Sequence, residues 1–371
     1  MLIARWIACA MIILAIGLAY GGPASAEGVR TQTPIRPHPY QEIELSIERR
    51  DAGVLLAGTL TMPSGVGRHP LIVMVAGSGP DDRDATSFGG HKPFLVIADY
   101  LARRGFAVFR FDDRSVGGSR GPPGTAEEIS DDIEFAVQEL RHRDDIQPEL
   151  VGILGASEGA NVAAMVARRD RQVAFIVLLA APGSSGAQLT LQQARASLGS
   201  NGQLTELQEK QISRQSLLLA AAAGPESHEE ARRRVGEVWS QMLKEAGRPE
   251  LPLPRALVEW VSPPNRFFLR YDPLPALREL DCGVLVILGD KDLKVPIESN
   301  APGIRDALKS NPRAKIVELP GINHLMQPAE VGSLEDGQHN PVTISPAVLA
   351  VLGDWLHGFA INKNRSPTKT Q

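Results

Sequence analysis

Residues 151–167 read VGILGASEGANVAAMVA, and this stretch decides the fold of the chain. Its apolar start, residues 151–154, is short enough for a buried parallel strand, and the alanine-rich end has helical spacing. The glycines at 155 and 159 predict a sharp turn between them, because a side chain at either position would clash where the chain doubles back. Such a turn exposes the hydroxyl of Ser157 above the sheet, so Ser157 is a candidate nucleophile. The GxSxG pattern alone leaves an ordinary strand-to-helix turn as the alternative.

Strands and helices alternate on both sides of this stretch. Apolar runs that indicate buried strands occupy residues 71–76, 106–111, 173–180, 283–288 and 314–319. Helical spacing occupies residues 91–104 and 125–143, where Thr125 and Glu128 predict a capping box. This order predicts an α/β fold with a mostly parallel central sheet flanked by helices, to which residues 43–48 and 54–61 add an antiparallel hairpin.

The composition limits the classes of function. The chain has 371 residues, a formal net charge of -4 and 43% hydrophobic residues, which fits one large domain or a domain with an insertion. Charges of both signs are interspersed and no basic tract occurs, so we expect no nucleic-acid partner. The sequence leaves the oligomeric state open.

Residues 1–26 have the organisation of a secretory signal peptide. Arg5 supplies the positive start, residues 6–20 the apolar run and residues 24–26 (ASA) a small-residue cleavage site. An uncleaved membrane anchor is the rival, but the run is shorter than the roughly 20 residues that span a bilayer. A lipoprotein attached through Cys9 is a weaker alternative. We therefore expect a secreted or periplasmic protein with no stable membrane span after cleavage, and with Cys282 as its one cysteine, which cannot form an internal disulfide.

The remaining chain divides into a core and an insertion. Residues 27–40 are expected to be a linker, residues 41–183 and 281–360 the core, residues 184–280 a helical cap or lid, and residues 361–371 a flexible tail. The insertion is helical in composition and carries aromatic residues that would suit a substrate pocket: Trp260, Phe267 and Phe268. A helical layer that serves only stability is the alternative.

Partners for the candidate nucleophile follow later in the chain. Asp290 and Asp292 lie in the loop after the strand at 283–288, and His324 lies in the loop after the strand at 314–319. A carboxylate there can orient an imidazole, and the order Ser, Asp, His, each after a strand, favours a catalytic triad of Ser157, Asp292 and His324. Asp292 is preferred over Asp290 as the acid.

The loop after the strand at 71–76 reads GSGPDDRD. It is expected beside the nucleophile, where the backbone N–H of Gly79, with that of Glu158, can meet a developing negative charge. A plain tight turn is the alternative. The three carboxylates at 81–84 match no calcium-loop spacing, and we expect an ion-pair network with Arg83 rather than a metal site.

The motifs GSGPDDRD with HKPF, FRFDDRSVGGS, GASEG, LGDKDLKVP and GINH together resemble those of bacterial esterases of the alpha/beta-hydrolase superfamily. The resemblance covers most of the mature chain and implies an alpha/beta-hydrolase fold with an inserted helical cap. It places the triad at Ser157, Asp292 and His324 and supports Asp292, since the family acid stands three positions after the strand-ending glycine. Ala156 departs from the pattern, where a histidine is frequent, and so does Ser115, where glycine is usual.

This resemblance implies a serine hydrolase that cleaves small-molecule carboxylic esters through an acyl enzyme, with no metal and no organic cofactor. A thioesterase, a peptidase or an acyltransferase would use the same fold and triad. A secreted binding module that has lost catalysis is less consistent, because all three triad positions are filled.

Overall fold

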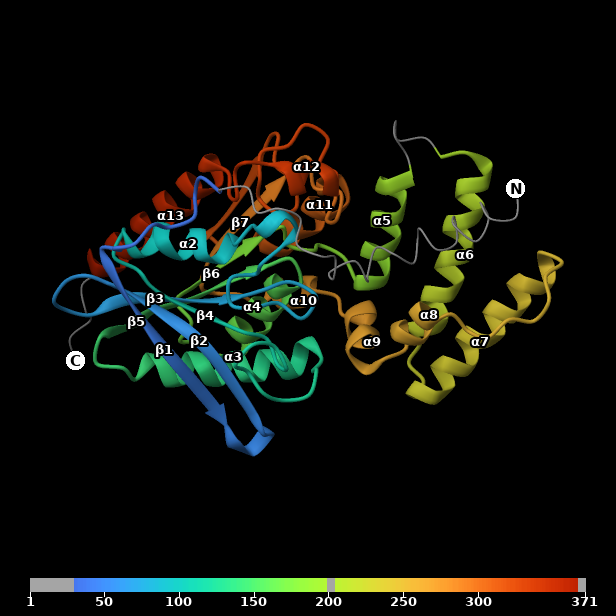
Figure 1. The fold of residues 1–371 in the computed structure, drawn as a ribbon, viewed down its shortest axis with the longest axis horizontal. Helices are drawn as coiled ribbons and strands as arrows, with labels where there is room; N and C mark the ends of the chain where they lie inside the picture. Colours follow the sequence, from blue (N-terminus) through green and yellow to red (C-terminus); the bar gives the residue numbers. More distant parts are fainter. Residues whose placement is uncertain (1–29, 199–203, 366–371) are drawn as a thin grey trace. The chain divides into compact units, whose positions relative to one another are not determined.

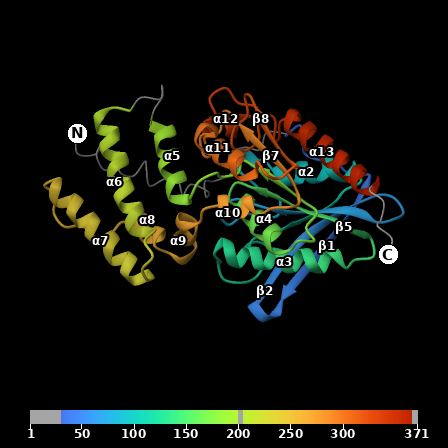
Figure 2. The same cartoon turned by 180° about the vertical axis from the view of Figure 1, so that it is seen from behind.

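The computed structural model describes residues 30–198 and 204–365, and their strands join in one sheet (Figures 1 and 2). The order across this eight-stranded sheet is β1-β2-β4-β3-β5-β6-β7-β8. Its strands are β1 (Tyr40–Arg49), β2 (Val54–Pro63), β3 (His69–Val75), β4 (Ala107–Phe111), β5 (Ile146–Ala156), β6 (Phe175–Leu179), β7 (Gly283–Gly289) and β8 (Ala314–Leu319).

Only β2 runs against the other strands of this sheet. It pairs antiparallel with β1 and with β4, whereas each pair from β4 through β3, β5, β6 and β7 to β8 is parallel. The predicted hairpin and the predicted mostly parallel sheet are therefore confirmed. Because the strands after β2 are parallel, their carboxyl ends meet at one edge, where the loops after β3, β5, β7 and β8 gather.

Helices cover both faces of the sheet (Figures 1 and 2). One face carries α2 and α13, whose apolar side chains join Ile72, Phe175 and Ile287 in a buried core. The opposite face carries α3 and α4, which pack on each other and on β5. Outside residues 185–272 the helices are α2 (Pro93–Ala102), α3 (Ala126–Arg141), α4 (Glu158–Arg169), α10 (Leu274–Arg278), α11 (Ile297–Leu308), α12 (Leu334–His339) and α13 (Pro346–Arg365).

The predicted capping box at the start of α3 is confirmed. The hydroxyl of Thr125 accepts a hydrogen bond from the backbone N–H of Glu128 at 3.2 Å, and the Glu128 carboxylate accepts one from the backbone N–H of Thr125 at 2.7 Å. Two N–H groups that the helix leaves unpaired are satisfied in this way. The capping box therefore fixes the residue at which the loop after β4 ends and α3 begins.

The ends of the core differ in detail from the expected segments. Residues 30–39 contain no helix or strand, but Arg30 Nε donates to the carbonyl of Gly89 at 2.9 Å and Gln32 Oε1 accepts from the backbone N–H of Thr343 at 2.7 Å. These bonds tie the expected linker to the core. At the other end α13 continues to Arg365, past the expected start of the tail at 361. The expected signal peptide lies outside the described residues.

Residues 185–272 form a second compact unit with a core of its own. That core includes Leu219, Val235, Leu257 and Leu269, and Arg266 donates to the carbonyls at the end of α6, including that of Ala222 at 3.0 Å. Residues 189–222 form two separate helices, and residues 252–272 contain two short ones. The unit comprises α5 (Gly186–Leu198), α6 (Glu206–Ala222), α7 (His228–Glu245), α8 (Arg255–Trp260) and α9 (Pro263–Arg270).

No helix within the described ranges combines the length and the apolar character that a membrane crossing requires.

Candidate active site

Ser157 stands at the turn between β5 and α4 in a strained backbone conformation. Its φ is 54° and its ψ is -120°, a region that residues with a side chain rarely occupy. The backbone N–H of Ser157 donates to the carbonyl of Leu179 at the end of β6, at 2.8 Å, which fixes this geometry. The half-buried side chain is consequently presented at the carboxyl edge of the sheet, as the sequence predicted for a nucleophile turn.

The two glycines of this turn allow close approaches between backbones. A Cβ at Gly155 would lie 2.1 Å from the carbonyl oxygen of Gly159, and a Cβ at Gly159 would lie 2.3 Å from those of Val75 and Ala76. Neither approach is compatible with a side chain, which confirms the steric prediction. The start of α4 therefore presses directly on the end of β3.

His324 and Asp292 form a close pair at the same edge of the sheet. His324 Nδ1 lies 2.9 Å from one carboxylate oxygen of Asp292 and 3.0 Å from the other. The Asp292 side chain is buried, and its Oδ1 also accepts from the backbone N–H groups of Lys294 and Val295 at 2.8 and 2.7 Å. Binding the carboxylate through Nδ1–H leaves Nε2 of His324 to accept a proton. Ser157 Oγ has no hydrogen bond to His324 within the described part of the chain.

Asp290, the rival candidate for the acid, has a different role. Its Oδ1 accepts from the backbone N–H of Gly321 at 2.6 Å, so the exposed carboxylate holds the turn that leads to His324. Asn323 is a residue that sequence reasoning missed. It is buried, and its Oδ1 accepts from the backbone N–H groups of Leu325 and Gln327 at 3.0 and 2.9 Å. An asparagine directly before the histidine was the available signal, since asparagine favours such local backbone hydrogen bonds.

The loop after β3, residues 76–80 (the β3 loop), lies against the nucleophile turn. A Cβ at Gly77 would lie 3.3 Å from the Cβ of Ser157, and Ser78 Oγ donates to Glu158 Oε2 at 2.5 Å. Gly79 has a φ of 128°, and a Cβ there would meet no atom within 4 Å. A side chain at Gly77 would thus meet Ser157, whereas the Cβ position of the predicted oxyanion residue Gly79 faces open space.

Three half-buried carboxyl groups lie beside the β3 loop: those of Asp81, Asp113 and Glu158. Burial raises the pKa of Asp81 to about 7, and repulsion from Asp82 adds to the shift. Burial also raises the pKa of Asp113 to about 7, with repulsion from Asp81, Asp112 and Glu158 adding to it. The loops of β3 and β4 are joined here, because Asp113 Oδ2 accepts from the backbone N–H of Asp81 at 2.9 Å. The carboxyl groups of Asp81 and Asp113 therefore exchange protons near neutral pH.

Arg83 and Asp84 of the GSGPDDRD motif form ion pairs. Arg83 pairs with Asp112 at 2.9 Å and with Glu44 at 2.6 Å, and the buried Arg110 pairs with Asp84. No cluster of three or more histidine, cysteine, aspartate or glutamate side chains suited to a metal ion occurs within the described ranges.

The aromatic residues predicted to bind substrate all belong to the insertion. Trp260 and Phe268 pack against the insertion's own core. Phe267 stacks on Tyr271, with 5.6 Å between the ring centroids. All three are half-buried.

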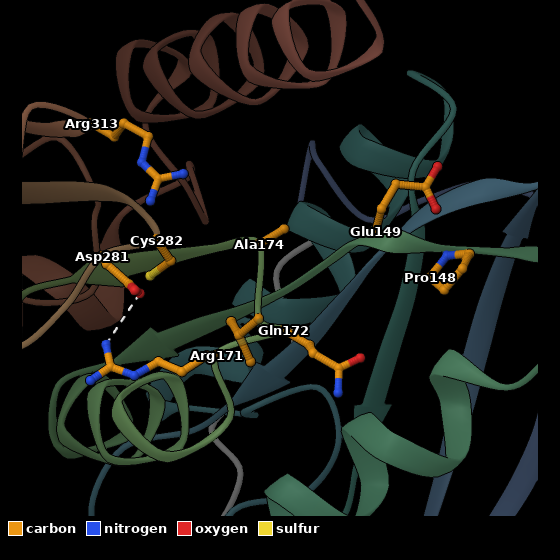
Figure 3. A pocket seen from close by; sticks show the side chains of 9 residues that line it. Pro148, Glu149, Arg171, Gln172, Ala174, Asp281, Cys282 and Arg313 are labelled. Atoms are coloured by element: carbon orange, nitrogen blue, oxygen red, sulfur yellow. Dashed lines mark ion pairs between the residues drawn. The ribbon is translucent and has the colours of Figure 1, made fainter. Parts of the chain in front are cut away.

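A hollow of about 470 Å³ lies where β6, β7 and β8 begin (Figure 3). It contains the ion pair of Arg171 and Asp281, at 3.2 Å, and the buried thiol of Cys282, whose pKa burial raises to about 11. Strand starts and strand ends lie at opposite edges of a parallel sheet, so this hollow is separate from Ser157 and His324.

Comparisons with known proteins agree with the fold. The model of the alpha/beta hydrolase family matches residues 72–332. Esterase EstD of Thermotoga maritima is 28% identical over 288 residues, which cover 76% of this chain and 60% of the esterase. An uncharacterised protein of Escherichia coli K12, YfhR, is 28% identical over 144 residues, or 38% of this chain and 48% of YfhR. The chain thus spans about half to three fifths of the length of these relatives.

Solved structures share the architecture at low sequence identity. The alpha/beta hydrolase GrgF from a Penicillium species has a TM-score of 0.54 at 17% identity, covering 86% of this chain and 99% of its own. The Pyrococcus furiosus esterase Pf2001 has a TM-score of 0.51 at 16% identity, covering 91% of this chain and 98% of its own. At such identities the likeness establishes the fold alone.

Proposed function

The chain belongs to the alpha/beta hydrolase family, and from this premise we propose that it is a serine esterase acting on carboxylic esters of small or medium acyl groups. The observation that carries the proposal is the contact of His324 Nδ1 with the buried Asp292 carboxylate, at the sheet edge where the strained Ser157 stands. The esterase named among the relatives supports the choice of ester substrates.

In the proposed reaction Ser157 Oγ attacks the ester carbonyl while Nε2 of His324 takes its proton. Asp292 holds the imidazole in the required tautomer and stabilises the imidazolium. The backbone N–H of Glu158, with that of Gly79 in the β3 loop, stabilises the negative oxygen of the tetrahedral intermediate. The imidazolium then protonates the leaving alcohol, and water activated by His324 releases the acid from the acyl enzyme.

The test is a substrate panel with the triad variants. Purified protein is assayed on p-nitrophenyl esters of graded chain length, beside thioester and peptide substrates. Ser157→Ala and His324→Ala are each expected to lower kcat by roughly several orders of magnitude, and the double variant by little more, because groups that act as a unit are non-additive. Asp292→Asn is expected to lose less, since the carboxylate orients rather than exchanges protons with the substrate.

Asp290→Asn is the matched control. It removes a carboxylate two residues away but keeps an oxygen that can accept from Gly321, so the turn and the turnover are expected to stay near those of the wild type. An active Ser157→Ala enzyme contradicts the mechanism. Full loss of activity in Asp290→Asn, with an active Asp292→Asn, contradicts only the choice of acid. If the wild type turns over thioesters or peptides faster than esters, a thioesterase or a peptidase on the same fold replaces the esterase assignment.

A further inference from the structure

We propose that Ser78 and Glu158 are positioning residues for the oxyanion donors: the hydrogen bond between their side chains holds the β3 loop against the nucleophile turn. This inference rests on the proposed esterase function. It concerns side chains to which the triad mechanism gives no part, because that mechanism uses only the backbone N–H of Glu158.

The bond joins two segments that are far apart in sequence. Ser78 Oγ in the β3 loop donates to Glu158 Oε2 at 2.5 Å, and Glu158 is the first residue of α4, directly after Ser157. The two backbone N–H groups proposed to meet the oxyanion, those of Gly79 and Glu158, are therefore each within one residue of this bond. Loss of this bond would free the segment that carries the Gly79 N–H to move relative to the N–H of Glu158.

Little else fixes the β3 loop. For residues 77–80, no further hydrogen bond is present within residues 30–198 and 204–365. Gly79 has no neighbour within 4 Å of its Cβ position, and its φ of 128° gives it the freedom of a glycine. The next anchor along the chain is Asp81, whose backbone N–H donates to Asp113 at 2.9 Å. Between the end of β3 and Asp81 the Ser78–Glu158 bond is thus the polar restraint.

The pKa of Glu158 also depends on Ser78. Burial raises the pKa of Glu158, while the hydrogen bond from Ser78 acts in the opposite direction and stabilises the carboxylate. The carboxyl group of Asp113 interacts with the same carboxylate, because burial raises its pKa and repulsion from Glu158 adds to the shift. Without the Ser78 hydroxyl, the Glu158 carboxyl would lose the donor that keeps it turned toward the loop.

Catalysis is sensitive to such positioning. Oxyanion donors act at about 2.7–3.1 Å from the developing charge, and a misplacement of about 1 Å can cost roughly 100-fold in rate. That charge exists only in the transition state, so a displaced donor lowers kcat and leaves ground-state binding nearly unchanged.

The test compares Ser78→Ala with the wild type on the best p-nitrophenyl ester. We expect kcat to fall about 10- to 100-fold with KM within about 3-fold. Affinity for a trifluoromethyl ketone, whose adduct carries the oxyanion, should weaken in step with kcat. Ser78→Thr keeps a hydroxyl and should recover much of the loss. Glu158→Gln keeps an acceptor oxygen and should retain at least about ten times the kcat of Glu158→Ala.

Thr86→Ala is the control for removing a hydroxyl from this region. The exposed Thr86 donates to Asp82 at 2.7 Å, which is also a hydroxyl-to-carboxylate bond, but it lies within one turn of chain and does not reach the nucleophile turn. Its kcat and KM should stay within about 2-fold of the wild type. A melting temperature for each variant separates lost positioning from lost folding.

Two outcomes overturn the inference. One is a Ser78→Ala enzyme whose kcat stays within about 3-fold of the wild type, and the other is a loss that appears in KM alone. Failure of the proposed function looks different, because the wild type would then be inactive on every ester or Ser157→Ala would remain active.

Discussion

Ser157 and Asp113 show how single residues in this site depend on their surroundings. A non-glycine residue with positive φ costs about 1–3 kcal/mol, which the fold must supply elsewhere. For Ser157 the restraint comes from the bond to Leu179 and from the two glycine contacts. For Asp113 the unfavourable factor is burial, which keeps its carboxyl protonated to higher pH.

The raised pKa of Asp113 predicts how stability depends on pH. An aspartate titrates near 4 when unfolded and here at about 7 when folded, so the folded state binds the extra proton between these values. Its contribution to the free energy of unfolding is complete below about pH 4 and is lost as pH rises to 7. An asparagine side chain at this position would carry no such charge, so Asp113→Asn should gain about 1–3 kcal/mol relative to the wild type at pH 8 but not at pH 4.

Thermal unfolding of both proteins from pH 4 to pH 8 measures this difference. The prediction is contradicted if the stability of Asp113→Asn differs from that of the wild type by the same amount at pH 4 and at pH 8.

At the scale of elements, the contact of α4 with β3 predicts the effect of a single methyl group. Gly159→Ala would place a Cβ 2.3 Å from the carbonyl oxygens of Val75 and Ala76, so the turn must shift. We expect a loss of about 2–4 kcal/mol in the free energy of unfolding, together with most of the turnover.

Gly358→Ala in α13 is the matched control. A Cβ there would meet no atom within 4 Å, and alanine is the better helix former. It should raise the free energy of unfolding by about 0.5–1 kcal/mol. Urea titration of both variants measures the two changes in the free energy of unfolding. Equal changes would show that the contact with β3 is not the reason for a glycine at position 159.

The helical insertion gives a second prediction at this scale. Phe268 packs against the insertion's core, so Phe268→Ala should cost about 3 kcal/mol of stability. Within the described residues, the one aromatic ring that stacks on Phe267 is that of Tyr271. We propose that Phe267 contributes to acyl-chain preference. Phe267→Ala should shift the profile over p-nitrophenyl esters of graded length. A fixed profile with lowered stability would assign Phe267 to the structure of the insertion instead.

At the scale of the whole molecule, export remains a proposal carried by residues 1–26. The positive Arg5, the apolar run at 6–20 and the ASA at 24–26 predict removal of these residues. Amino-terminal sequencing of protein from the native cell envelope should find a chain that begins at Glu27. A protein that begins at Met1 contradicts the proposal.

The sequence by itself determined the order of strands and helices, because apolar spacing and turn residues report the local backbone. The capping box at Thr125, the hairpin and the glycines around Ser157 were all readable in this way. The start of β5 could not be read in this way: residues 147–149 are Gln, Pro and Glu, and the strand reaches back to Ile146 beyond the apolar run. Pairing of Ile146 with His69 of β3, rather than composition, extends it.

The tertiary structure decided which side chains meet. Asp292 and Asp290 both follow β7, and sequence order could not separate their contacts with His324 and with Gly321. The bond between Ser78 and Glu158 spans 80 residues, and the raised pKa of Asp113 comes from burial beside Asp81. Such contacts depend on which strands become neighbours in the sheet, and neighbouring strands here are β3 and β5, with two helices and β4 between them in the chain.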